Sequence, residues 1–459
     1  MPHHKAQTAA LMASPDDVEA QFYEALREAD IDKLMALWTE EDDIVCIHPG
    51  GPRMVGHAAV RAAFEAVFAN GAIQVHAENV RCVQSLSCSV HSVMERIDLM
   101  TAEGPRVGWV MATNVYFKTT QGWRLASHHA SPGTPHVPPE YRAPWWLPGG
   151  HAQTIWAATL AGRGASEPWV FQRERWATPD GDFIDVDFRF AERAAPWVVL
   201  FHGLEGSSQS AYAQAFAAQA QRRGWTLAIP HFRGCSGELN LAPRAYHSGD
   251  YEEIGWILAR LRARSNQALQ VAGVSLGGNA LLRWAQEAGE AASQTASAVA
   301  AICSPIDLAA CGQAIGRGFS RQVYTRMFLR SMKPKALAKW QQHPGLFDRE
   351  RLRAARDLYE FDNLFTAPLH GFKNTEDYWA RASAKPHLER LRLPALVLNA
   401  RNDPFVPAAC LPTASEVGSP YVRLWQPESG GHVGFPAGPW PAQVVDMPAA
   451  VLDWLAHPQ

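Results

Sequence analysis

Cysteines are few in this sequence and long apolar runs are missing, and each shortage excludes a class of protein. Seven cysteines among 459 residues form no C-x-x-C pair, so neither a zinc site nor a redox pair is indicated. Several lie within apolar segments, which favours buried, reduced thiols. No window holds the roughly 18 apolar residues that a membrane span needs. Residues 1–14 contain no apolar core of a secretion signal, so we expect a cytoplasmic protein.

Neither positive nor negative charge is in excess. The 42 Lys and Arg residues nearly balance the 45 Asp and Glu residues, which gives a net charge of −3. Such a balance argues against a nucleic-acid-binding protein. The sequence is 47% hydrophobic and contains 17 Trp and 19 Phe residues, as expected for a globular protein with sizeable cores. At about 150 residues per domain, the length predicts two or three domains.

Proline and glycine divide the chain near residue 140. The segment Ser131–Tyr141 reads SPGTPHVPPEY, and such a run cannot continue a helix or a central strand. We therefore predict one domain over residues 14–130, a linker over 131–143 and a second domain over 144–459.

Helices precede strands in the first domain. Ser14 followed by Pro15 and two acids predicts a helix start, and a further helix is expected over His57–Ala69. Helices followed by antiparallel strands indicate an α+β domain. The predicted strands are Ile44–Ile47, Ile73–Val83, Ser87–Leu99, Val107–Thr119 and Gly122–His129.

This order and the stretch TEEDDIVCIHPGGPRMVGHAAVRAAFEAVFAN, Thr39–Asn70, resemble the SnoaL-like members of the NTF2-like superfamily. The resemblance implies a curved sheet that wraps a helix and leaves a conical pocket. An isomerase in such a pocket needs a base that faces an oxyanion donor. The sequence does not show whether two such groups face each other. The alternatives are a pocket for a small hydrophobic ligand, or a homodimer formed through this domain. Candidate polar groups are Trp38, Asp43, His48, His57 and His128.

The second domain alternates apolar runs with helical stretches, which is typical of a parallel sheet covered on both faces. The more polar segment Trp176–Phe188 predicts an antiparallel hairpin at the sheet edge. The predicted parallel strands are Trp197–Phe201, Thr226–Ile229, Leu269–Ala272, Ala298–Cys303, Ala395–Asn399 and Tyr421–Trp425.

One serine lies between glycines, after a predicted strand and before a predicted helix, Asn279–Glu287. The segment Gly273–Gly277 reads GVSLG and matches G-x-S-x-G, a strained turn whose neighbours must lack bulky side chains. Ser275 then stands at a helix N-terminus, where backbone N–H groups favour an anion. The alternative is a glycine-rich turn with an incidental serine.

A serine nucleophile needs a histidine base held by a carboxylate, in the chain order Ser, acid, His. Asp403 follows the predicted strand Ala395–Asn399, and His432 follows the last strand. Both should therefore lie at the sheet edge that carries Ser275, as a catalytic triad requires. Asp307 is a rival acid, better explained as a helix cap. Such a triad needs no metal and no organic cofactor.

Two backbone amides should stabilise the oxyanion. The first belongs to Leu276, directly after the serine, and the second to Leu204, in the loop after Trp197–Phe201. His202 is expected to brace this loop, because it precedes the position expected for the base.

At these residues the second domain resembles the YheT-like branch of the α/β-hydrolase superfamily, related to the eukaryotic ABHD lipases and esterases. The resemblance implies Ser275, Asp403 and His432 as the triad, and a small-molecule or lipid ester as the substrate. A catalytically silent scaffold is the alternative. The matching stretches are LPGGHAQT from Leu147, FHGLEGSSQS from Phe201, HFRGCSGE from His231, RAYHSGD from Arg244, GVSLGGN from Gly273, TAPLHGF from Thr366, NARNDPF from Asn399 and GGHVGF from Gly430.

A long insertion at about residues 306–386 predicts a helical cap over the serine. Phe319, Tyr324 and Phe328, with Met327 and Leu329, could line an acyl pocket, and ordinary packing within the cap is the alternative. A basic stretch could form a solvated face, or could make a weak contact with anionic lipid surfaces. This stretch comprises Arg317, Arg321, Arg326, Arg330, Lys333 and Lys335.

Overall fold

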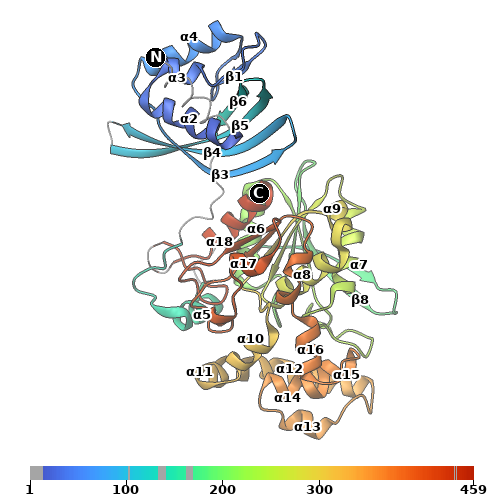
Figure 1. Ribbon diagram of the computed structural model, residues 1–459. Helices are drawn as coiled ribbons and strands as arrows, with labels where there is room; N and C mark the ends of the chain where they lie inside the picture. Colours follow the sequence, from blue (N-terminus) through green and yellow to red (C-terminus); the bar gives the residue numbers. More distant parts are fainter. Residues whose placement is uncertain are drawn as a thin grey trace. The chain divides into compact units, whose positions relative to one another are not determined.

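The computed structural model describes residues 14–101, 104–132, 141–161, 169–438, 440 and 442–458. The chain forms two compact units, Met1–Val137 and Pro138–Gln459, each with its own sheet (Figure 1). Most of the predicted linker, 131–143, lies outside the described residues, as do residues 1–13 of the N-terminus. All seven cysteines are described and unpaired, and five of them are buried.

The first unit is a six-stranded sheet of order β2-β1-β6-β5-β4-β3, whose long strands curve around α2 (Figure 1). Strand β1 runs parallel to β6, and all other neighbours are antiparallel. The unit comprises α2 (Pro15–Glu28), α3 (Ile31–Met35), β1 (Val45–Ile47), β2 (Arg53–Val55), α4 (His57–Phe68), β3 (Gln74–Gln84), β4 (Cys88–Thr101), β5 (Gly104–Thr119) and β6 (Gly122–Pro132).

Helix α2 begins where the sequence predicts. The Ser14 hydroxyl accepts a hydrogen bond from the Asp17 amide at 3.1 Å, and the Asp17 carboxylate accepts one from the Ser14 amide at 3.0 Å. This capping box satisfies two amides that the first helical turn leaves free. Phe22 and Leu26 then pack into the core formed with Phe64 and Leu125. The expected α+β cone is confirmed.

The second unit is built on an eight-stranded sheet of order β14-β13-β12-β11-β9-β10-β8-β7. Strands β9 to β14 pair in parallel, while β7 and β8 form the predicted antiparallel hairpin at one edge. The strands are β7 (Gln172–Ala177), β8 (Phe183–Arg189), β9 (Trp197–Phe201), β10 (Thr226–Pro230), β11 (Leu269–Val274), β12 (Ala296–Ile302), β13 (Ala395–Leu398) and β14 (Val422–Trp425).

Helices cover both faces of this sheet, because the central strands are apolar on both sides. Every residue of β11 is buried. Helices α7 (Tyr251–Arg262) and α8 (Leu276–Ala288) pack in one core, and α6 (Ala211–Arg222) and α18 (Asp446–Ala456) pack in the other. This is the expected α/β-hydrolase architecture. Smaller elements are α5 (Gly149–Thr159), η1 (Gly289–Ala291), α9 (Ala292–Thr295), η5 (Ala408–Cys410) and α17 (Ala414–Val417).

A helical insertion lies between β12 and β13, and its helices gather at one end of the second unit (Figure 1). Asp307 caps its first helix, as the sequence predicts, by accepting a hydrogen bond from the Ala310 amide at 3.0 Å. Among the described helices, none is long and apolar enough to cross a bilayer. The insertion comprises α10 (Leu308–Ile315), α11 (Gly318–Ser320), η2 (Arg321–Thr325), α12 (Arg326–Gln342), α13 (Arg349–Ala354), α14 (Leu358–Phe361), η3 (Asp362–Thr366), α15 (Ala367–Leu369), α16 (Thr375–Ala382) and η4 (Lys385–Arg390).

Candidate active site

The turn between β11 and α8 holds Ser275 in a backbone conformation that L-residues rarely adopt, with φ 52° and ψ −120°. The Ser275 amide donates to the Ile302 carbonyl at 2.8 Å. Glycine is required at both flanking positions, because neighbouring backbone atoms lie too close to leave room for a Cβ. A Cβ at Gly273 would lie 2.6 Å from the Gly277 carbonyl oxygen, and one at Gly277 would lie 2.5 Å from the His202 carbonyl oxygen. The turn is therefore the strained strand-to-helix turn that G-x-S-x-G predicts.

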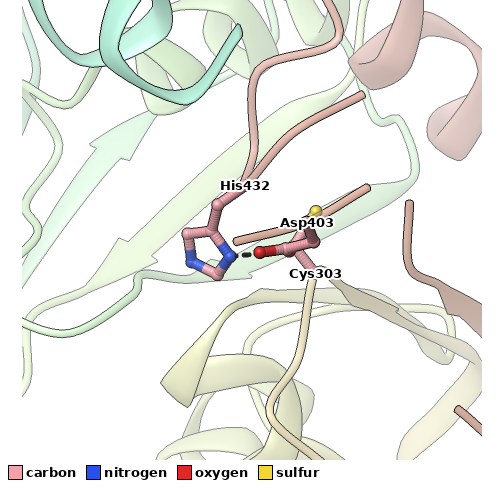
Figure 2. A group of neighbouring side chains, drawn as sticks. All are labelled: Cys303, Asp403 and His432. Atoms are coloured by element: carbon pink, nitrogen blue, oxygen red, sulfur yellow. Dashed lines mark hydrogen bonds and ion pairs between the residues drawn. The ribbon is translucent and has the colours of Figure 1, made fainter. Parts of the chain in front are cut away.

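The structure brings Ser275, His432 and Asp403 within hydrogen-bonding distance of one another. His432 Nε2 lies 3.0 Å from Ser275 Oγ, and His432 Nδ1 lies 2.8 Å from Asp403 Oδ2. Figure 2 shows the imidazole edge that carries Nδ1 facing this carboxylate. Because a carboxylate only accepts hydrogen bonds, Nδ1 carries the proton and the Nε2 lone pair faces the serine hydroxyl.

Asp403 and His432 are themselves held in place. The Asp403 side chain is fully buried, and its Oδ1 accepts from the Phe405 amide at 2.7 Å. The Phe405 ring stacks on the imidazole with ring centroids 4.1 Å apart. These contacts leave the base little freedom to turn away from the serine.

The loop after β9 approaches Ser275 closely. A Cβ at Gly203 would lie 3.1 Å from the Ser275 Cβ. Leu204 and Leu276 line the same cavity as Ser275. Within the described residues, neither of these leucine amides donates to a protein acceptor, so both are free to meet a ligand oxygen.

His202 braces this loop, as the sequence predicts. Its Nδ1–H donates to the Gly203 carbonyl at 2.8 Å, and its Nε2 accepts from the Phe232 amide at 3.0 Å. Burial lowers the pKa of His202 to about 3. The imidazole therefore stays neutral, with both nitrogens occupied.

A cavity that offers about 170 Å³ to the centres of water-sized molecules extends from Ser275 and His432 into the cap and opens to solvent. Its lining is mostly apolar, and the aromatic members are Tyr246, Phe328, Phe361, Phe365, Tyr378, Trp379 and Phe405.

The three aromatic residues predicted to bind substrate lie at different places. Phe328 lines the cavity, whereas Tyr324 and Phe319 are not part of its lining. Tyr324 is buried, packs edge-on against Phe405 and accepts or donates a hydrogen bond at His151 Nδ1, 3.0 Å away. Phe319 is 52% exposed and packs against the His151 ring. Tyr324 thus reaches the cavity only through the Phe405 ring, and Phe319 lies one ring further away. A direct substrate contact stays a prediction for Phe328.

The cavity also contains charged residues that sequence reasoning missed. Asp362 lies in a π-helical turn and accepts from the Thr366 hydroxyl at 2.7 Å and the Trp379 indole at 3.0 Å. Burial raises the pKa of Asp362 to about 6. Lys335 pairs with Glu205 at 2.9 Å and so links the cap to the loop after β9. A π-helical turn is a frequent sign of a functional site, but only coordinates reveal one.

Cys303, Asp403 and His432 also form a group that could hold a metal ion, since their donor atoms lie within 4.8 Å of one another (Figure 2). The Cys303 sulfur accepts a hydrogen bond from the Val433 amide at 3.2 Å. Burial, with the neighbouring Asp403 charge, raises the pKa of this thiol well above its usual value. Metal binding to cysteine requires the thiolate, so this donor set does not suit a metal.

The predicted basic stretch does not share one face. Lys335 points to the cavity, where it pairs with Glu205. Four of the other residues, Arg321, Arg326, Arg330 and Lys333, line a groove on the cap surface together with Arg356. We call it the basic groove. It is lined by Arg321, Gln322, Arg326, Leu329, Arg330, Lys333, Ala355 and Arg356.

The first unit contains a buried polar network that the sequence indicated only through His128. Two carboxylates, from Glu19 on α2 and Glu95 on β4, are 6% and 5% exposed. Burial raises the pKa of Glu95 to about 7. The bonds are His91 Nδ1 to Glu19 at 2.8 Å, the Tyr116 hydroxyl to Glu19 at 3.1 Å, the Tyr23 hydroxyl to Glu95 at 2.9 Å, the Asn114 amide to the Tyr23 hydroxyl at 3.2 Å and His128 Nδ1 to Asn114 Oδ1 at 2.7 Å.

The other polar candidates of the first unit lie in different surroundings. Trp38 Nε1 and His48 Nε2 are buried without a hydrogen-bond partner among the described residues. His57 Nε2 bonds the Thr39 carbonyl at 2.7 Å, and Asp43 is exposed. Asp43 therefore does not contribute to the interior, and the half-buried His57 has one ring nitrogen satisfied by the backbone.

Comparison with known proteins agrees with both folds. A family model described as alpha/beta hydrolase fold matches residues 196–439, more than half of the chain, and one described as SnoaL-like domain matches residues 16–135. An Escherichia coli protein named "Putative esterase YheT" is 38% identical over 288 residues, which cover 61% of this chain and 84% of that protein.

Other similar proteins are more distant. The human "Phospholipase ABHD3" is 25% identical and covers 68% of this chain and 78% of its own length. A Streptomyces avermitilis protein of the NTF2-like family, solved by crystallography, is 26% identical over 29% of this chain and 99% of its own, with a TM-score of 0.24. The chain belongs to the α/β-hydrolase family, in its YheT-like, esterase- and lipase-like branch, and carries a SnoaL-like unit ahead of the hydrolase fold.

Proposed function

We propose that the protein is a serine carboxylesterase, with Ser275 as nucleophile, His432 as general base and Asp403 as the group that orients the imidazole. The single observation that carries this proposal is the unbroken hydrogen-bond chain from Asp403 through His432 to the strained Ser275, at 2.8 and 3.0 Å. The esterase and lipase names of the relatives agree with this chemistry.

The geometry suits a two-step acyl transfer. Ser275 Oγ attacks the ester carbonyl while its proton passes to His432 Nε2, and the buried Asp403 carboxylate stabilises the imidazolium. The Leu204 and Leu276 amides then hold the oxyanion, each worth about 10²- to 10³-fold in rate. The alcohol leaves with the proton from His432. Water, deprotonated by His432, attacks the acyl-serine and releases the acid.

Ser275→Ala tests this function. Turnover of p-nitrophenyl butyrate should fall by about four orders of magnitude or more, since the base then has no nucleophile to activate. An unchanged unfolding temperature is the control for folding. A variant that hydrolyses the ester as fast as the wild type would refute the proposal.

The catalytically silent scaffold remains a distinct alternative, and a fluorophosphonate probe separates the two. We expect the probe to label Ser275 in the wild type and not in Ser275→Ala, because labelling requires an activated serine. Absence of labelling in the folded wild type would favour the scaffold.

A lipid ester presented at a membrane is the substrate form that the cap favours. The basic groove gathers five cations, and Phe319 and Met327 on the same cap are 52% and 48% exposed. Cations and exposed apolar side chains on one cap match an anionic lipid surface.

For the first unit, we propose a binding site for a small hydrophobic ligand in the cone. The unpartnered Trp38 Nε1 and His48 Nε2 favour it, because buried polar atoms without partners are destabilising unless a ligand or water meets them. A homodimer also stays a prediction. It would cover apolar side chains exposed on the outer face of the sheet, namely Val83, Met111 and Phe117.

A further inference from the structure

Four consecutive backbone amides around His432 each donate a hydrogen bond to a side chain from elsewhere in the second unit. These side chains come from α5, from the loop that carries Asp403 and from the end of β12. The bonds are Gly430 to Gln153 Oε1 at 2.9 Å, Gly431 to Asn402 Oδ1 at 2.9 Å, His432 to Thr154 Oγ1 at 2.8 Å and Val433 to Cys303 Sγ at 3.2 Å.

The backbone that these bonds hold has a hydrogen bond of its own, from the Phe435 amide to the Gly430 carbonyl at 2.8 Å, but it follows an unfavourable path. Gly431, Val433 and Phe435 have φ values of 62°, 56° and 41°. For a non-glycine residue this region is unfavourable by about 1–2 kcal/mol. Such conformations persist only where the surroundings determine them, so the side-chain acceptors, together with this backbone bond, fix the path of the chain through His432.

The acceptors are also connected to one another. Gln153 Oε1 accepts from Asn402 Nδ2 at 3.0 Å as well as from the Gly430 amide, and the Thr154 hydroxyl donates to the Gly150 carbonyl at 2.7 Å. Packing is tight, because a Cβ at Gly150 would lie 1.8 Å from the Asn402 carbonyl oxygen. Since Asn402 precedes Asp403, one set of contacts joins the acid loop to the histidine loop.

We propose that Gln153, Thr154 and Asn402 form a clamp that positions His432 between Asp403 and Ser275. The clamp rests on the proposed esterase function. None of its side chains touches the reacting atoms, so all three are positioning residues. A displacement of about 1 Å can lower a rate by about 10², and His432 must meet two partners at once. The LPGGHAQT segment thereby becomes part of the catalytic arrangement, although it lies ahead of the sheet.

Thr154→Val is the decisive variant, because valine keeps the shape and removes the hydroxyl that accepts from the His432 amide, together with its own bond to the Gly150 carbonyl. We expect kcat for p-nitrophenyl butyrate to fall by about 10- to 100-fold with KM within twofold of the wild type, measured well below the unfolding temperature. Thr154→Ser retains the hydroxyl and should recover most of kcat. Thr159→Val is the matched control, since the Thr159 hydroxyl is exposed and bonds only its own helix at Ile155.

Gln153→Met provides a second measurement if Thr154→Val fails to fold, because it removes the acceptor of a different amide, Gly430. It should slow fluorophosphonate labelling of Ser275 by about 10-fold or more. A folded Thr154→Val enzyme with wild-type kcat would overturn the clamp, as would equal losses in Thr154→Val and Thr154→Ser. Full activity in Ser275→Ala would instead overturn the esterase function itself, a result that needs no clamp variant.

Discussion

Backbone strain at the residue scale concentrates around the proposed catalytic centre. Among the described residues, seven non-glycine residues have positive φ, and five of them surround the site: Glu205, Ser275, Cys303, Val433 and Phe435. Four of them belong to segments that supply the nucleophile, the histidine or the loop amides, and the fifth, Cys303, accepts a hydrogen bond from the Val433 amide beside the histidine. Each strained residue lowers the stability of the folded protein, and such strain usually clusters at functional sites, where the geometry must be fixed.

The residue-scale prediction concerns Glu95, whose buried carboxyl group has its pKa raised to about 7 from 4.5. Because the folded-state pKa is the higher one, the stabilising contribution is fully present below pH 4.5 and is lost as the pH rises through 7. Glu95→Gln keeps the acceptor for Tyr23 and removes this titration. We therefore expect the variant to unfold at a higher temperature than the wild type at pH 8, with the difference vanishing towards pH 4.5.

The measurement for Glu95 is thermal unfolding of the full chain at several pH values, with exposed Glu65 changed to Gln as the control. A wild-type and a Glu95→Gln protein with parallel pH profiles would show that this carboxyl group is ionised without penalty, and the buried network would need another explanation.

At the scale of elements, the sequence predicted the strands of the second unit and the turn at Ser275 because both depend on local patterns. Strand β11 was expected over Leu269–Ala272 and spans Leu269–Val274. Strand β2 was missed because it has only three residues, Arg53–Val55, none of them buried, and three residues are too few to show a period. Side-chain periodicity reports local conformation and burial, so short edge strands leave little trace in it.

The contacts between distant elements could not be predicted from one sequence. Glu19 meets Tyr116 across 97 positions, and Gln153 meets the Gly430 amide across 277. In the sequence, Glu19 is indistinguishable from the polar face of an ordinary amphipathic helix. Only the fold shows its buried partners, His91 and Tyr116. His432 and Asp403 were expected to meet because both follow strands that end at one sheet edge. Nothing comparable indicated Asn402 or Thr154.

The element-scale prediction concerns the cap, where Phe328 lines the cavity and Phe319 does not. Phe328→Ala removes apolar surface from the wall of the proposed acyl pocket. We expect KM for p-nitrophenyl octanoate to rise by about 10-fold, at about 25 cal/mol per Å² of lost contact, with little change for p-nitrophenyl acetate. Phe319→Ala is the matched control. Equal effects of the two variants on both esters would show that the cavity wall does not select the acyl chain.

At the scale of the whole molecule, the net charge of −3 hides an uneven distribution. Five cations line one groove of the cap, and the carboxylates near them lie at ion-pair distances of 3.8 Å, from Arg321 to Asp357 and from Arg356 to Glu360. Exposed ion pairs at this separation have a small interaction energy, so these carboxylates compensate the cations only weakly. The groove therefore keeps a positive potential on a protein that is slightly acidic overall, and long-range attraction to anionic surfaces would act through the cap first.

The whole-molecule prediction is that the full chain binds phosphatidylglycerol vesicles through this groove. Changing Arg326 and Arg330 to Gln removes two charges, each worth about 1 kcal/mol near an anionic surface, so sedimentation with vesicles should show binding about 30-fold weaker. Changing Arg222 and Arg423 to Gln alters the net charge equally, away from the groove, and should have little effect. Binding should also weaken as salt rises. If both double variants bind like the wild type, or if the wild type binds phosphatidylcholine vesicles equally well, the cations of the cap do not direct this protein to membranes and its substrate must arrive from solution.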